Sequence, residues 1–76
     1  MDEAGSHDLA PGGYRHFKGG RYEVIGVATD TETELPVVVY RSSNGRLWVR
    51  SLAMFTEIVE RDGYVGPRFV RDDTNR

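Results

Sequence analysis

The side chains that could do chemistry in this sequence are mainly cationic and aromatic, and they gather in two short stretches. The first is YRHFKGGRYEV at residues 14–24, and the second is RLWVR at residues 46–50. Guanidinium groups beside a tryptophan suit cation–π stacking and can hold a phosphate or carboxylate. The alternative is that these side chains only cover a small core. The candidate ligand-binding residues are Trp48, Arg41, Arg50, His16 and Lys18.

His16 is the residue best suited to acid–base chemistry. As a general base it would need a nucleophile or a bound water, and Glu23 could orient its ring. A structural cross-strand pair of His16 and Glu23 is the preferred interpretation. No cysteine and no nearby acidic cluster joins it. The sequence therefore predicts no catalytic residues, no metal site and no cofactor.

The size of the chain also weighs against an enzyme. Seventy-six residues form one small domain, which leaves little room for both a core and a deep substrate cavity. The net charge of −2 is not the basic bias of a general nucleic-acid binder. We expect residues 1–12 to be a flexible segment, residues 13–71 to be the domain and residues 72–76 to be a flexible tail. Residues 1–12 have no apolar run, so no signal peptide or membrane segment is expected there.

Short strands and tight turns must position the candidate residues. Three dipeptides favour hairpin turns: Gly19-Gly20, Asn44-Gly45 and Asp62-Gly63. Between them lie β-rich stretches at 21–28, 35–41 and 46–50, with Gly26 where a bulge is expected. This spacing is typical of a small all-β barrel or sandwich. Residues 51–63 stay open between a helix capped by Ser51 and one helical turn followed by a strand at 56–60.

The turn dipeptides also predict strand registers. A two-residue loop at Asn44-Gly45 would place Arg41 opposite Trp48, and a four-residue loop at 42–45 keeps the same side chains on each face. One face would then be core, with Val38, Tyr40, Leu47 and Val49, and the other would carry Val37, Val39, Arg41, Trp48 and Arg50. A loop at Gly19-Gly20 would pair Phe17 with Tyr22 and His16 with Glu23. Phe17, Tyr22 and Val24 would then be core, and Tyr14 would lie on the other face with His16.

The order of these motifs resembles a small bacterial family, domain of unknown function 1653. The resemblance runs from about Gly13 to Arg71 and includes YRHFKGGRY, VYR, LWVR, MF and PRF. It implies a small SH3-like β-barrel of about five strands with one short helical turn near residues 51–55, so it decides the open segment. It implies no activity. The motif positions that match are Tyr14, Arg15, His16, Lys18, Tyr22, Tyr40, Arg41, Trp48 and Arg50.

The leading functional hypothesis is a non-catalytic binding or accessory module with an aromatic and basic contact face. One alternative is RNA binding through the same face, and another is a small enzyme that uses His16 with Glu23. The partner would be a protein or a nucleic acid and not a membrane. We expect a cytoplasmic protein that is a monomer or a weak homodimer.

Overall fold

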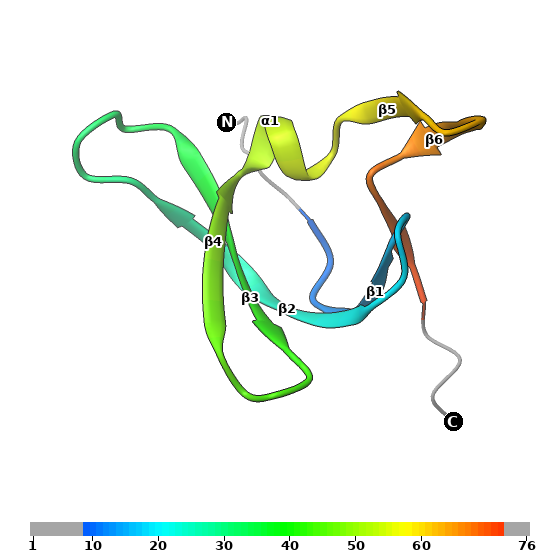
Figure 1. Cartoon of the computed structure of the whole chain (residues 1–76). Helices are drawn as coiled ribbons and strands as arrows, with labels where there is room; N and C mark the ends of the chain where they lie inside the picture. The colour runs from blue at the N-terminus through cyan, green and yellow to red at the C-terminus, as the bar shows by residue number, and fades with distance from the viewer. Residues whose placement is uncertain (1–8, 73–76) are drawn as a thin grey trace.

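The computed structural model describes residues 9–72 and is mainly β, as the sequence predicts (Figure 1). Seven strands and one four-residue helix follow each other along this part of the chain. Their bounds are β1 Gly12–His16, β2 Arg21–Thr29, β3 Pro36–Ser42, β4 Leu47–Ser51, α1 Leu52–Phe55, β5 Ile58–Arg61, β6 Tyr64–Pro67 and β7 Phe69–Arg71. Within residues 9–72, α1 is far too short to cross a membrane.

The strands form two open sheets, where the family resemblance implies one SH3-like barrel of about five strands. Five strands pair in the order β4-β3-β2-β1-β7, and every pair is antiparallel. The strands β5 and β6 form a separate hairpin. Closure would need β4 to pair with β7 or with the β5–β6 hairpin, and no such pairing joins the strands of residues 9–72.

The first two hairpins of the large sheet close with three-residue loops, whereas the sequence predicted a loop centred on Gly19-Gly20 and a loop of two or four residues at 42–45. In the β1–β2 hairpin, His16 N–H donates to Gly20 O and Gly19 N–H donates to His16 O. The β3–β4 hairpin repeats this pattern, with Ser42 N–H donating to Arg46 O and Gly45 N–H donating to Ser42 O. Gly19 and Gly45 have φ of +99° and +87°, the positive values that a three-residue loop requires at its last residue.

The longer loop exchanges the two faces of β4 relative to the prediction. Tyr40 lies opposite Trp48, and Arg41 lies opposite Leu47. The register is shifted by one residue, which turns every side chain of one strand to the other face. Trp48 therefore shares a face with Tyr40, while Val49 is 65% exposed rather than part of the core.

The first hairpin differs from its predicted register by three residues. Tyr14 lies opposite Tyr22 and Gly13 lies opposite Glu23, so the predicted pair of His16 with Glu23 does not form. An odd shift also exchanges faces. Tyr14 is therefore buried, and Phe17 lies in the loop instead of in the core strand.

The other local predictions are confirmed. The register of β2 with β3 shifts between Val24 and Gly26, as expected for a bulge. Asp62 and Gly63 form the two-residue loop of the β5–β6 hairpin, because Arg61 lies opposite Tyr64. Residues 52–55 form one helical turn and a strand follows, as the family resemblance implies.

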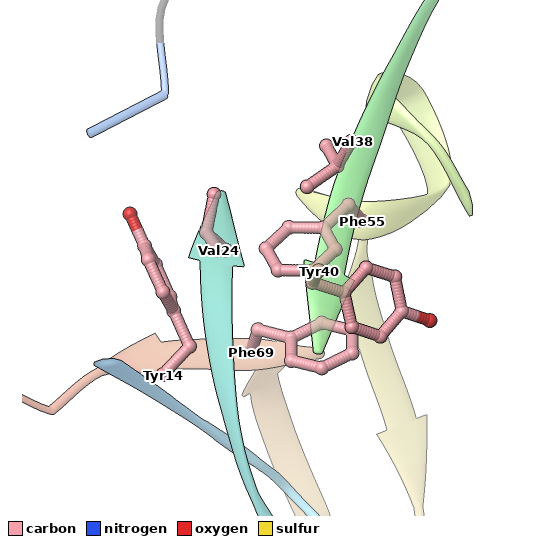
Figure 2. Close-up of a cluster of buried hydrophobic side chains, with 6 residues drawn as sticks. All are labelled: Tyr14, Val24, Val38, Tyr40, Phe55 and Phe69. Carbon is pink, nitrogen blue, oxygen red and sulfur yellow. The ribbon is translucent and has the colours of Figure 1, made fainter. Parts of the chain in front are cut away.

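The core lies on one side of the large sheet, which we call the inner face. Figure 2 shows six buried side chains there, contributed by β1, β2, β3, α1 and β7. At its centre the rings of Phe55 and Phe69 stack, with centroids 4.0 Å apart and planes within 4°. The six residues are Tyr14, Val24, Val38, Tyr40, Phe55 and Phe69.

The folded unit extends beyond the expected domain bounds at both ends. Leu9 packs against the core, and the Ala10 carbonyl accepts a hydrogen bond from the Tyr14 hydroxyl at 2.9 Å. At the other end, Asp72 is buried, and its carboxylate accepts from Arg15 at 2.9 Å. Of the segments expected to be flexible, 1–12 and 72–76, residues 1–8 and 73–76 lie outside the described residues.

Candidate anion-binding site

His16 lies on the inner face, at the end of β1, among aromatic rings. It pairs across the sheet with Phe69, and the two ring centroids are 4.9 Å apart at a steep angle. The Phe17 ring lies 4.8 Å away on another side, and Tyr22 lies at 6.5 Å. The imidazole is therefore half-buried in an apolar surrounding rather than paired with a carboxylate.

Three cations act on His16 through their charge. Burial lowers the pKa of His16 below its usual value, and the positive charges of Arg50, Arg68 and Lys18 lower it further. Of these three, Arg68 has a carboxylate partner, Glu57 at 2.8 Å. Across residues 9–72, no carboxylate lies within ion-pair distance of Arg50 or Lys18. The local charge is therefore positive and incompletely neutralised.

The hydrogen bonding of His16 fixes which ring nitrogen can donate. Its Nδ1 accepts a hydrogen bond from the Lys18 backbone N–H at 3.1 Å. An imidazole that accepts at Nδ1 and is neutral carries its proton on Nε2. In the described part of the chain no acceptor takes the Nε2 proton, so this group can donate to a ligand.

Arg50 reaches the same region from β4. Its Cζ lies 5.9 Å from the centroid of Phe69, the ring that His16 also contacts. Its Nε donates to the Tyr40 hydroxyl at 3.4 Å, which orients the guanidinium. The two basic stretches of the sequence thus converge on one ring. We call the resulting set the basic–aromatic cluster: His16, Lys18, Tyr22, Arg50, Arg68 and Phe69.

Trp48 is on the same face of the sheet but nearer its edge. The residue is 41% exposed. Its indole N–H donates to Ser42 Oγ at 3.1 Å, and the guanidinium of Arg46 lies 4.6 Å from its ring centroid. The cation that stacks on Trp48 is therefore Arg46 and not Arg41.

Arg41 does not join the site. It lies on the outer face of the large sheet, opposite the buried side chains, because β3 residues alternate and Tyr40 points inward. Its Nε lies 3.8 Å from Glu23 on the neighbouring strand, and both side chains are well exposed. The predicted pair of Arg41 with Trp48 requires a two-residue loop in the β3–β4 hairpin, and the observed loop has three residues.

A cavity of about 490 Å³ opens beside His16. Phe17 and Tyr64 form part of its wall, and their rings stack with centroids 5.4 Å apart. Arg15, Arg71 and Asp72 also line it, and the Asp72 carboxylate accepts a hydrogen bond from Arg15 at 2.9 Å. Of the basic–aromatic cluster, His16 is the residue that lines this cavity.

The cluster combines N–H donors and positive charge with flat apolar rings. This arrangement can hold a phosphate or carboxylate whose attached group lies against the aromatic side chains. Within residues 9–72, no three His, Asp or Glu side chains are grouped to hold a metal ion. The sequence reasoning found His16, Lys18 and Arg50 but missed Arg68 and Phe69. Both belong to the PRF motif, which could have suggested them.

The comparisons with known proteins identify the family. The sequence profile of DUF1653, a family of proteins of unknown function, matches residues 12–71. A crystal structure of a DUF1653 protein from Bordetella bronchiseptica is similar, with 36% sequence identity and a TM-score of 0.79. The similarity covers 87% of this chain and 90% of that one. None of the curated proteins matches the sequence. The chain therefore belongs to the DUF1653 family of proteins of unknown function.

Proposed function

We propose that this protein is a non-catalytic binding module that holds an anionic ligand at the basic–aromatic cluster. The observation that carries the proposal is that three cations act on His16, while within residues 9–72 Arg68 alone of the three has a carboxylate partner. Like charges brought together are unfavourable unless something neutralises them. A bound phosphate or carboxylate would do so.

The surroundings of the cluster support a ligand with a flat apolar part. The rings of His16, Tyr22 and Phe69 lie within 6.5 Å of one another. The open cavity beside His16 supplies space at its edge. The ligand class is therefore an aromatic or heterocyclic anion, such as a benzoate or a nucleoside monophosphate.

A titration followed by NMR tests this proposal. The probes are inorganic phosphate, benzoate and adenosine monophosphate, and the signals are the His16 ring protons, the Arg50 Nε–H and the Trp48 indole. We expect shifts at His16 and Arg50, larger for the two ring-bearing anions than for phosphate. Arg50→Gln should weaken binding by about tenfold or more, since a charge-assisted hydrogen bond contributes about 1.5–3 kcal/mol.

The matched control is Arg61→Gln. Arg61 is an exposed arginine of β5 and has no carboxylate within ion-pair distance in the described structure. The control should bind like the parent protein. Equal weakening in both variants would show a general charge effect and would contradict a site at the cluster. Unshifted His16 and Arg50 signals with all three probes would also contradict it.

A second candidate function is contact with single-stranded RNA, which Trp48 favours. Its exposed ring and the stacked Arg46 form a platform of the kind that holds bases and phosphates. Trp48 fluorescence should then fall on addition of a single-stranded oligonucleotide, with an affinity that drops steeply as salt rises. Binding that is insensitive to salt, or an unchanged fluorescence, would rule this candidate out.

A further inference from the structure

The strand β4 is an open edge of the large sheet. It pairs with β3 and with no other strand among residues 9–72 (Figure 1). The hairpin closes with Ser42 N–H donating to Arg46 O, and hydrogen-bonded pairs alternate along an antiparallel ladder. Trp48 and Arg50 therefore bond to β3. The N–H and C=O groups of Leu47 and Val49 point away from the sheet, available to another strand.

The β4 edge lacks three features that block strand addition, which are a proline, a bulge and a very short strand. Its remaining protection is the positive charge of Arg46 and Arg50, which opposes a basic strand but not an acidic one. The sequence LWVRS has no proline, and its pairing with β3 runs without a shift from Leu47 to Ser51. The opposite edge differs, since β7 has only three residues. A five-residue regular edge is long enough to pair with an extended peptide.

The side chains of β4 alternate between apolar and basic. Leu47 and Val49 are 57% and 65% exposed and lie on the outer face. Arg46, at the end of the preceding loop, and Arg50 lie on the other side with Trp48 between them. In residues 9–72, neither arginine has a carboxylate within ion-pair distance. An added strand would meet apolar and positively charged positions in turn.

We propose that the β4 edge binds an extended acidic segment of a partner protein as a sixth strand of the large sheet. Apolar residues of that segment would lie beside Leu47 and Val49, and acidic residues would lie beside Arg46 and Arg50. Opposite charges across neighbouring strands are favourable, and like charges are not. A second copy of this chain would bring the same two arginines to the interface, so an acidic partner complements the edge better. Backbone hydrogen bonds supply affinity in this mode, and the side-chain pattern supplies specificity.

The test uses the full chain and a synthetic peptide with the core Glu-Val-Thr-Val-Glu, whose order places glutamates beside the two arginines. The amide signals of Leu47 and Val49 are followed by NMR. We expect them to shift and to exchange more slowly with solvent. A peptide N-methylated at both valines cannot donate to the edge and should bind about tenfold or more weakly. A peptide with lysine in place of glutamate should also bind weakly.

Two variants complete the experiment. Val49→Pro removes an outward N–H that β3 does not use, so the sheet should fold but lose peptide binding. Arg46→Glu should weaken binding of the glutamate peptide and strengthen binding of the lysine peptide, a charge exchange that a folding defect cannot mimic. Three results would each overturn the proposal. They are unshifted Leu47 and Val49 amides at about 1 mM peptide, equal binding of the N-methylated peptide, and dimerisation of the free chain that Val49→Pro abolishes.

Discussion

Phe55 is the residue whose replacement should damage the fold most. It is 1% exposed, stacks on Phe69 at 4.0 Å and meets the edges of Tyr14 and Tyr40 at 5.6 and 5.4 Å. Replacing a buried phenylalanine by alanine costs about 3–5 kcal/mol. A chain of 76 residues has a total stability of about 4–11 kcal/mol, at ~0.05–0.15 kcal/mol per residue. Phe55→Ala should therefore remove about a quarter to all of the stability.

Phe55→Leu makes this prediction measurable, because it keeps the site apolar. The smaller cavity and the lost ring stacking should cost about 1–2 kcal/mol. For a domain of this size the melting temperature should fall by about 4–16 °C. The assay is thermal unfolding followed by far-ultraviolet circular dichroism and Trp48 fluorescence.

Met54→Leu is the matched control, because it changes the neighbouring helical residue, which is exposed. Its stability should stay within about 0.5 kcal/mol of the parent value. A melting temperature within about 2 °C of the parent for Phe55→Leu would refute the reasoning, because it would mean that no packed ring stack is lost.

Three further predictions concern the ends of the fold, its helix and its histidine. Asp72→Asn should lower the free energy of unfolding in urea by about 1–2 kcal/mol, because it removes the negative charge that accepts hydrogen bonds from Arg15. The expected loss is small because Arg15 is only partly shielded from water. An unchanged urea midpoint would contradict this anchoring role. Ser51→Ala should lower the free energy of unfolding by about 0.5–2 kcal/mol, because the Ser51 hydroxyl caps α1 by accepting from Met54 N–H at 3.2 Å. Ser51→Asp keeps a side-chain acceptor at this position and should restore most of that stability. Because folding lowers the pKa of His16, the unfolded chain binds this proton more readily below the ordinary value of about 6.5, so stability should rise with pH up to about 6.5. His16→Gln should flatten that rise just below about pH 6.5, and an equal slope in both proteins would contradict the proposed environment.

Most strands and turns could be predicted from the sequence, but the register of two hairpins could not. The glycines at 19 and 45 do mark hairpins, as predicted, because positive φ is required there. Local sequence does not distinguish a loop that uses two residues from one that uses three. The register shifts by one residue in the β3–β4 hairpin and by three in the β1–β2 hairpin. Each odd shift exchanges the two faces, so the predicted faces of Trp48 and Tyr14 are wrong. The helical turn at Leu52–Phe55 was decided by the family resemblance and not by periodicity.

The candidate site was predictable residue by residue but not as an assembly. His16, Lys18 and Arg50 stand out because of their chemistry. Their meeting around Phe69 depends on β7 pairing with β1, a contact between residues more than fifty positions apart. No local pattern encodes that pairing. Arg41 was misplaced for the same reason as Trp48, because its face follows from the register of the β3–β4 hairpin.

The separate β5–β6 hairpin has a consequence for how the molecule moves. Within residues 9–72, one backbone bond joins its base to the first hairpin of the large sheet, from Phe17 N–H to Arg68 O, whereas the bond from Arg68 N–H to Glu57 O continues the β5–β6 ladder itself. A segment held by few such bonds, one ring stack and the buried Val59 can open locally at a lower free energy than global unfolding. Amides of β5 and β6 should therefore exchange with deuterium earlier than those of β2 and β3.

Opening of this hairpin would also alter the candidate site. It would withdraw Arg68, one of the three cations beside His16, and separate Phe17 from Tyr64. An anion that binds the closed form more tightly than the open form stabilises the closed hairpin. The stabilisation equals the difference between its binding free energies for the two forms. The deuterium uptake of the β5–β6 amides is thus a readout of occupancy at a site formed largely by other strands.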